Sequence, residues 1–259
     1  MIEHFKNKIR RIKLAIKTGE KFLNDKYFIN TESIIKKEVA KEIVRTDIIN
    51  YFLSLTPGKE YLEIGVKNPK NNFDHIICRN KYSVDPGIEF KTNPVDYKMT
   101  SDVFFEKLKS NELSGLDNTV KFDVIFIDGL HLADQVEIDI KNSLNYIKED
   151  GFIVLHDCNP PTEFHQREDY YFRNSPARGY WNGTTWKAYY KYRHHKDLYS
   201  ICFDTDWGVA VLSKKQLPHF NSLKEPIANP FYEYLVLDKN RQQFLNLIDF
   251  NDWKKSIKE

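Results

Sequence analysis

The chain has 259 residues, 41% of them hydrophobic and 14% aromatic, which is enough to bury a substantial core in one large domain. A net charge of +2 excludes the strongly basic composition typical of nucleic-acid-binding domains. Three cysteines are too few for a disulfide framework, no apolar run is long enough to cross a membrane, and the N-terminus lacks an apolar signal core, so we expect a cytoplasmic protein.

The N-terminal part of the sequence predicts helices. Residues 5–23 have apolar side chains at helical spacing, with lysines and arginines between them. This basic amphipathic helix is expected to pack on the domain or on a second subunit, as in a homo-oligomer, or to make a peripheral contact with anionic lipid. A second helix is predicted from about Ser33 to Leu55, where Thr56-Pro57-Gly58 stops it. Residues 1–56 thus form an N-terminal helical extension.

Strand and helix patterns then alternate. Short apolar runs predict strands at residues 60–66, 82–85, 94–99, 122–128 and 152–155, with a crossover helix near 72–77 and helices after Thr100 and over 133–147. Strands at 199–203 and 207–212 are joined by so short a turn that they must be antiparallel. We therefore predict an α/β fold with a mostly parallel sheet and one reversed strand near its edge.

The remaining segments complete this domain. The irregular stretch 162–185 is rich in aromatic residues and indicates a binding loop, and a helix over 186–192 follows it. The tail contains one more predicted helix, at about 230–248. We place the domain at residues 57–213 and describe 214–259 as a C-terminal helical tail that packs on it.

Side chains that can carry chemistry follow the predicted strands, where parallel sheets bind their ligands. Gly65 allows the chain to turn close to a ligand, and the Asp85 carboxylate can accept hydrogen bonds from both hydroxyls of a ribose. Asp128 and His131 follow the most apolar strand. These residues favour a nucleotide-containing cofactor. The alternative is that an acid caps the strand end and no ligand binds there.

Seven motifs, in order, resemble class I S-adenosylmethionine-dependent methyltransferases, most closely the bacterial branch that acts on sugars of surface polysaccharides and on glycosylated natural products. They are Leu62–Val66, Val84–Pro86, Thr100–Asp102, Phe126–His131, Leu155–Glu163, Trp181–Ala188 and Asp204–Gly208. The resemblance implies a Rossmann-like, doubly wound, seven-stranded sheet with one antiparallel strand. Lys67 and Pro69 stand where later glycines are expected, which argues against a Rossmann dehydrogenase.

The resemblance also implies that S-adenosyl-L-methionine is the cofactor and assigns residues to it. Asp128 would stand at the end of the cofactor from which the methyl group is transferred. The other cofactor residues would be Glu63 and Gly65 beneath the methionine part, Asp85 at the ribose hydroxyls, and Ser101 and Asp102 near the adenine.

Methyl transfer to a sugar hydroxyl requires the loss of a proton whose pKa is far above 7. Relatives of this kind hold Mg²⁺ with acids after the fourth and fifth strands, and Asp128 and Asp157 match those positions. His156 stands where some relatives have a second Asp, although Mg²⁺ prefers oxygen ligands. Without a metal, His131 or His156 would be the general base.

The acceptor site is predicted at Trp181, Asn182 and Trp186, and the alternative is that this segment is a packed part of the core. The leading hypothesis is an O-methyltransferase that acts on a carbohydrate hydroxyl, with no nucleic-acid partner. Two alternatives stay open. One is methylation of another small molecule, such as a phenol or an amine, and the other is a catalytically silent domain that serves as a binding or assembly partner.

Overall fold

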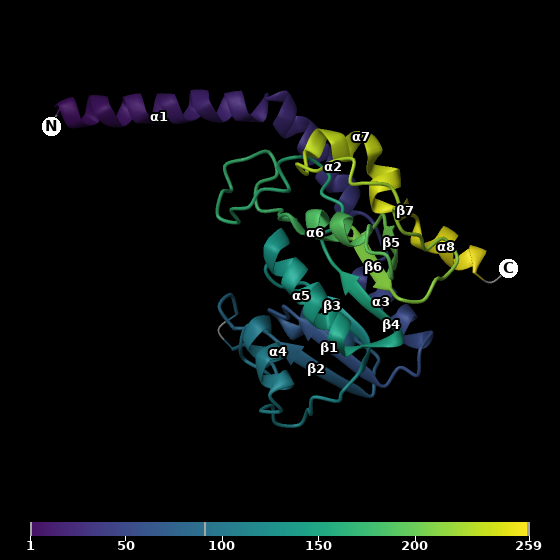
Figure 1. Cartoon of the computed structure of the whole chain (residues 1–259). Coiled ribbons are helices and arrows are strands. Elements are labelled where there is room, and N and C mark those ends of the chain that lie inside the picture. The colour runs from purple at the N-terminus through teal and green to yellow at the C-terminus, as the bar shows by residue number, and fades with distance from the viewer. Residues whose placement is uncertain (1, 91, 258–259) are drawn as a thin grey trace.

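The computed structural model describes residues 2–90 and 92–257 (Figure 1). Helix α1 (Ile2–Leu23) projects from the body as a straight arm, and α2 (Lys26–Val39) and α3 (Arg45–Ser54) bring the chain onto the sheet. The prediction of one helix over 33–55 is wrong, because the chain leaves the helical path between Ala40 and Val44. Tertiary hydrogen bonds hold this break, since Thr205 donates to the carbonyl of Ile43 and Asp206 accepts from the backbone of Arg45.

The body is built on a seven-stranded sheet in the order β2-β1-β3-β4-β6-β5-β7. All neighbouring strands are parallel except β6, which runs antiparallel to both β4 and β5. The predicted Rossmann-like sheet with one reversed strand is therefore confirmed. The strands are β1 (Glu60–Ile64), β2 (Asn80–Val84), β3 (Phe122–Ile127), β4 (Ile147–Leu155), β5 (Tyr199–Phe203), β6 (Val209–Ser213) and β7 (Leu247–Ile248).

Two apolar layers cover the sheet, and β3 shows how the sequence supplies both. All six of its residues are buried. Ile125 and Ile127 pack into one layer, while Val124 and Phe126 pack into the other. A strand with helices on both faces needs no polar alternation, which explains the continuous apolar run over Val124–Ile127. The first layer contains α4 (Ser101–Lys109), α5 (Ala133–Tyr146), α6 (Thr185–Tyr192) and α7 (Tyr234–Leu245), and the second contains α3 and α8 (Phe250–Ser256).

Two predicted elements near β2 differ from the structure. The crossover expected near 72–77 is not an α-helix but two 3₁₀ turns, η1 (Pro69–Asn71) and η2 (Phe73–His75). The strand expected at 94–99 is reduced to one parallel bridge between Tyr97 and Val84. The Asp96 side chain prevents a longer ladder, because its Oδ2 accepts from both the backbone N–H and the hydroxyl of Ser83, at 2.9 and 2.6 Å.

The tail contributes more structure than the single helix expected over 230–248. Asn246 caps the C-terminal end of helix α7 and adopts a left-handed conformation with φ of 51°. β7 then pairs with β5 and adds the seventh strand, and α8 buries Trp253, whose ring stacks on Phe52 of α3. The domain boundaries predicted at 57 and 213 stay a prediction. No described helix is long and apolar enough to cross a bilayer.

Candidate active site

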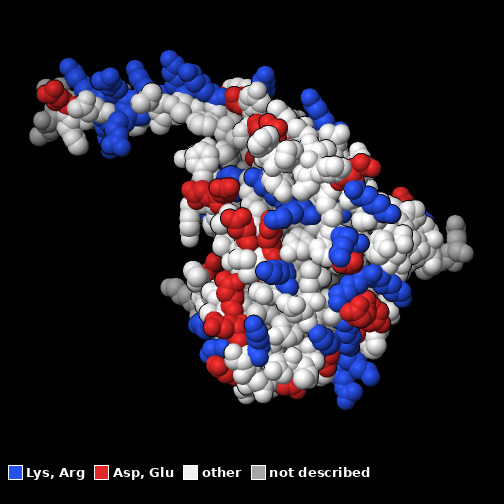
Figure 2. Space-filling model, viewed as in Figure 1, with Lys and Arg blue, Asp and Glu red and all other residues white. Residues whose placement is uncertain are grey.

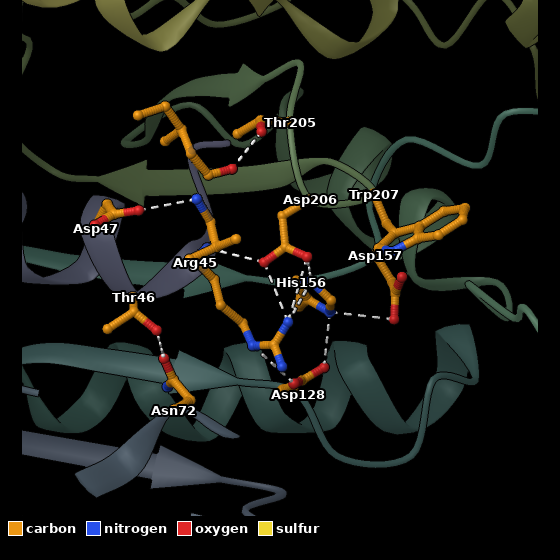
Figure 3. Close-up of polar contacts among 12 residues, drawn as sticks. Arg45, Thr46, Asp47, Asn72, Asp128, His156, Asp157, Thr205, Asp206 and Trp207 are labelled. Carbon is orange, nitrogen blue, oxygen red and sulfur yellow. Dashed lines mark hydrogen bonds and ion pairs between the residues drawn. The ribbon is translucent and has the colours of Figure 1, made fainter. Parts of the chain in front are cut away.

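Two acid–histidine pairs meet at the C-terminal ends of β3 and β4. Asp128 follows β3, and its backbone N–H donates to the Ile64 carbonyl of β1 at 2.8 Å. His156 and Asp157 follow β4, and Figure 3 shows both beside Asp128. The two ends lie level because β3 and β4 are parallel neighbours, so the carboxyl edge of the sheet gathers these side chains as the sequence predicts.

His131 lies between the two acids. Its Nε2 hydrogen-bonds Asp128 Oδ1 at 3.1 Å, and its Nδ1 lies 3.0 Å from Asp157 Oδ2 as an ion-pair contact outside hydrogen-bond geometry. Burial opposes protonation of the ring, but the Asp157 and Asp128 carboxylates outweigh it and raise the pKa of His131 to about 10. In this arrangement the ring is an imidazolium at neutral pH.

His156 makes a second bridge between the same acids. Its Nδ1 lies 3.1 Å from Asp128 Oδ1 and 3.2 Å from Asp157 Oδ2. Burial again opposes protonation, yet Asp128 and Asp157 raise the pKa of His156 well above its usual value. Burial would raise the pKa of Asp128, but His156 and His131 lower it well below its usual value. Each charge in the cluster thus stabilises the opposite charges beside it.

Arg45 and Asp206 complete the cluster, and the sequence analysis singled out neither as a site residue. Asp206 Oδ2 accepts from the backbone N–H of Arg45 at 2.8 Å and from its guanidinium Nη1 at 3.1 Å (Figure 3). Arg45 Nε lies 3.8 Å from Asp128 Oδ2. His156 Nε2 lies 3.4 Å from Asp206 Oδ1 and 3.3 Å from Arg45 Nη1. When His156 is protonated, both its Nε2 and the Arg45 Nη1 are donors, so the contact with Asp206 is the favourable one for Nε2.

The cluster is electrically balanced. Asp128, Asp157 and Asp206 carry three negative charges, and Arg45 with the two imidazoliums carries three positive charges. Three residues of the cluster could also hold a metal ion. Asp128, His131 and Asp157 each offer one ligand atom, and these three atoms lie within 4.8 Å of one another. Two oxygens and one imidazole nitrogen suit a divalent transition metal at least as well as Mg²⁺.

Asp85 ends β2, beside β1, and is tightly held. Its Oδ2 accepts from the backbone N–H of Lys67 at 2.8 Å, and its Oδ1 accepts from the backbone N–H of Gly87 at 2.6 Å and from the Asn93 amide at 2.9 Å. The amide oxygen of Asn93 is buried and has no hydrogen-bond donor among the described residues. The Asn93 side chain thus supports the Asp85 carboxylate through its amide N–H group.

Glu63 and Gly65 support this edge from below. Glu63 is 2% exposed, and its Oε2 accepts from the Tyr61 hydroxyl at 2.7 Å and from the Asn72 amide at 2.9 Å. Burial raises the pKa of Glu63 to about 8. Gly65 has a φ of +85°, and a Cβ there would lie 2.3 Å from the Asp128 carbonyl oxygen. Glycine is thus required because two backbone segments cross at this point.

Ser101 and Asp102 open helix α4 and are joined to α5. The Gln135 amide lies 3.1 Å from Asp102 Oδ1, 3.4 Å from the Ser101 hydroxyl and 3.2 Å from Asp139 Oδ1. Asp139 is buried, and that burial raises its pKa to about 6. The sequence did not indicate Gln135 or Asp139, because no local pattern distinguishes a buried polar residue on a helix from an exposed one.

The three predicted acceptor residues have different surroundings. Trp181 is half-buried and stacks on His131, with ring centres 5.0 Å apart. Asn182 is fully buried, and its amide donates to Asp157 Oδ1 at 2.9 Å, so it positions that carboxylate. Trp186 is fully buried in the core with Tyr190 and Tyr232 around it, which corresponds to the alternative of a packed core segment.

Comparison with known proteins bears on this arrangement. Residues 72–158, about a third of the chain, match the model of a family described as a methyltransferase domain. The match contains the β2 strand end with Asp85, the β3 end with Asp128 and His131, and the β4 end with His156 and Asp157. None of the curated proteins matches the chain.

Solved structures with a similar arrangement include three methyltransferases. That of Podospora anserina PaMTH1 with S-adenosylhomocysteine is 14% identical over 79% of this chain and 96% of its own, with a TM-score of 0.45. The Bacillus cereus O-methyltransferase with the same ligand is 11% identical over 73% of this chain and 91% of its own, with a TM-score of 0.42. The O-methyltransferase TomG of Streptomyces achromogenes is 12% identical over 77% of this chain and 95% of its own, with a TM-score of 0.40. Such low values carry no argument about function.

Proposed function

We propose that this protein is an S-adenosylmethionine-dependent O-methyltransferase that acts on a sugar hydroxyl of a surface polysaccharide or of a glycosylated metabolite. One observation carries the proposal: the Asp128–His131 pair meets the His156–Asp157 pair at the carboxyl edge of the sheet, inside the segment that matches a methyltransferase domain. The choice of cofactor rests on the residues at the ends of β1, β2 and β3, and the choice of a sugar acceptor rests on Trp181.

The cofactor would lie along the ends of β1, β2 and β3. Asp85, whose carboxylate Asn93 holds in place, would accept hydrogen bonds from the ribose hydroxyls. Ser101 and Asp102, at the start of α4, would lie at the adenine end. Glu63 and Gly65 would support the turn beneath the methionine part. The cofactor supplies a methyl group on a positively charged sulfur, and Asp128 would stand at that end.

The protein would position the acceptor oxygen and receive its proton. Positioning supplies much of the rate, because the oxygen must line up with the methyl–sulfur bond. To take the hydroxyl proton, His131 or His156 must first release to solvent the proton that the neighbouring carboxylates hold on its ring. Asp128, within 3.1 Å of both rings, would then stabilise the imidazolium that forms again. A divalent ion held by Asp128, Asp157 and His131 would instead lower the pKa of the hydroxyl.

Trp181 would form one wall of the acceptor site. Its ring is stacked on His131, and its indole N–H donates to the Arg167 carbonyl at 2.6 Å, so it is held in place beside the catalytic group. Aromatic rings with one apolar face and a fixed polar end suit amphipathic partners, and the rings of a sugar and of a phenol both qualify. An acceptor panel of sugar hydroxyls, phenols and amines distinguishes these classes by rate.

Binding of S-adenosylhomocysteine, measured by isothermal titration calorimetry, tests the proposal first. We expect binding in the micromolar range, and Asp85→Ala should weaken it at least tenfold, while Asp150→Asn, an exposed acid, should leave it unchanged. No binding at tens of micromolar would contradict both enzyme hypotheses. Binding without transfer to any acceptor would favour the silent domain.

Chelation separates the two routes of proton removal. If activity is lost in EDTA and restored by Mg²⁺ or Mn²⁺, the metal role of Asp128 and Asp157 is supported. If EDTA leaves the rate unchanged, the histidines are the general bases.

A further inference from the structure

The arm formed by α1 has the character of a binding surface. Every side chain from Glu3 to Thr18 is exposed, and Figure 1 shows the helix extending away from the body. The exposed side chains include large apolar ones: Phe5 is 64% exposed, Ile12 50% and Ile16 57%. An exposed apolar set of this size on one helix marks an interaction site rather than scattered surface residues.

The apolar side chains form one stripe. Phe5, Ile9, Ile12 and Ile16 follow one another at intervals of four, three and four residues, and Leu23 continues the same line. This spacing keeps them on one side of an α-helix along most of its length. At about 1.5 Å per residue, a helix of 22 residues presents a stripe that is about 30 Å long.

The rest of the helix surface is strongly basic. It contains seven lysines and arginines against two glutamates, and Figure 2 shows basic side chains gathered along the arm. The arm alone therefore has a larger positive charge than the whole chain, whose net charge is +2, and the remainder is net acidic. The basic residues are Lys6, Lys8, Arg10, Arg11, Lys13, Lys17 and Lys21.

Charge argues against a second copy of the arm as the occupant of the stripe. In a parallel pair of such helices, Lys8 of one copy would lie beside Lys13 of the other, at the flanking positions where coiled coils place opposite charges. Gly19 would leave a gap in the seam between Ile16 and Leu23. An anionic lipid surface has the opposite charge and accepts an apolar stripe without a matching partner.

We propose that α1 docks the protein on an anionic phospholipid surface, with the Phe5–Leu23 stripe in the acyl boundary and the lysines and arginines at the headgroups. The lysine and arginine stems can cover the edges of the stripe while their charged ends reach the phosphates. This proposal uses no property of the methyltransferase site, so it stands or fails apart from the proposed function.

The base of the arm connects this surface to the active-site loop. Phe22 and Leu23, at the end of α1, line a cavity of about 270 Å³ together with residues of α2 and with four loop residues, Arg173, Asn174, Ser175 and Arg178. Glu32 of α2 forms an ion pair with Arg178 at 3.6 Å, and Tyr27 packs edge-on against Phe164. Docking through α1 would therefore hold the loop that carries Trp181 close to the lipid surface.

Co-sedimentation of the full chain with lipid vesicles tests the proposal. We expect binding to vesicles of phosphatidylcholine with phosphatidylglycerol, little binding to phosphatidylcholine alone, and release at about 0.5 M NaCl, where surface charges are screened. Arg10→Gln with Arg11→Gln should lower the partition coefficient about 30-fold. Ile12→Ser with Ile16→Ser should lower it at least about 100-fold even at low salt.

A matched variant controls for net charge. Lys215→Gln with Lys224→Gln removes the same two charges from exposed positions on the body and should leave binding unchanged. Circular dichroism checks that each variant is folded, which we expect because every substituted side chain is exposed. Equal binding to neutral and anionic vesicles, or no effect of either arm variant, would overturn the proposal. A dimer in analytical ultracentrifugation that Ile12→Ser with Ile16→Ser abolishes, without vesicle binding, would assign the stripe to a second copy instead.

Discussion

The Asp206 carboxylate binds Arg45 twice, through the backbone N–H at 2.8 Å and through the guanidinium at 3.1 Å. These two residues are 161 positions apart, and the pair connects the start of α3 to the turn between β5 and β6. Because the guanidinium also faces Asp128 and His156, the N-terminal extension contributes a positive charge to the candidate active site. The extension is thus part of the candidate active site and not only a support for the sheet.

Replacement of Arg45 tests this connection. Arg45→Gln should lower the free energy of unfolding by about 2–3 kcal/mol, toward the low end of the cost of breaking a buried ion pair, since 21% of the side chain is exposed. Arg45→Lys keeps the charge and should recover part of the loss. Chemical denaturation measures both, and Arg173→Gln, an exposed arginine in the loop, should change stability by less than about 0.5 kcal/mol.

Asp128 is the side chain on which we expect turnover to depend most. Asp128→Asn keeps the size of the side chain but removes the charge that both histidines face, so methyl transfer should fall at least about 100-fold. Initial rates at saturating S-adenosylmethionine measure the effect. Asp252→Asn, a change at an exposed acid of α8, is the control. Full activity of Asp128→Asn would show that the reaction centre lies elsewhere.

The two tryptophans should respond differently to truncation. Trp181→Ala should raise KM for the acceptor and change stability little, because the ring packs on His131 at the rim of the site. Trp186→Ala should lower the free energy of unfolding by about 3–5 kcal/mol, because the side chain is fully buried. Steady-state kinetics and thermal denaturation of both variants separate these roles. A raised acceptor KM in a fully stable Trp186→Ala variant would contradict the core assignment.

Asp139 should make stability depend on pH. Its pKa is raised by burial from 3.8 to about 6, so between those values the folded state binds more protons than the unfolded state. Stability contributed by the protonated group is therefore complete below about pH 4 and is lost as the pH rises through about 6. Asp139→Asn removes this loss, and it should exceed the wild type in stability by up to about 3 kcal/mol at pH 7.

Denaturation curves at several pH values measure the difference between Asp139→Asn and the wild type. The two should converge at pH 4, where the wild-type carboxyl is protonated in the folded state. Asp150→Asn, at an exposed position, should show no such trend. If the difference in stability between the wild type and Asp139→Asn were the same at pH 4 and at pH 7, the prediction would be wrong. The fold would then stabilise the Asp139 carboxylate as well as water does.

The sequence by itself determined the sheet and the main catalytic candidates. The apolar run of β3, the glycine at Gly65 and the polar residues after each strand are local patterns, and the geometry of a parallel sheet brings strand ends to one edge. Asp128, His131, His156 and Asp157 could therefore be expected together. The match to a methyltransferase domain covers these same strand ends.

Only the tertiary structure decided the contacts between distant segments. Arg45 reaches Asp206 across 161 positions, and the helix break before Arg45 depends on Thr205 and Asp206, so no local pattern indicated either feature. The Asp96 side chain took the hydrogen bonds that a strand at 94–99 would have needed. The sequence around Trp181 and Trp186 does not distinguish a binding residue from a core residue. Tertiary packing alone places Trp181 on His131 and Trp186 in the core. Sequence patterns report which backbone conformation a segment favours, whereas the partner of a buried polar or aromatic side chain is set by chain segments that meet only in the folded state.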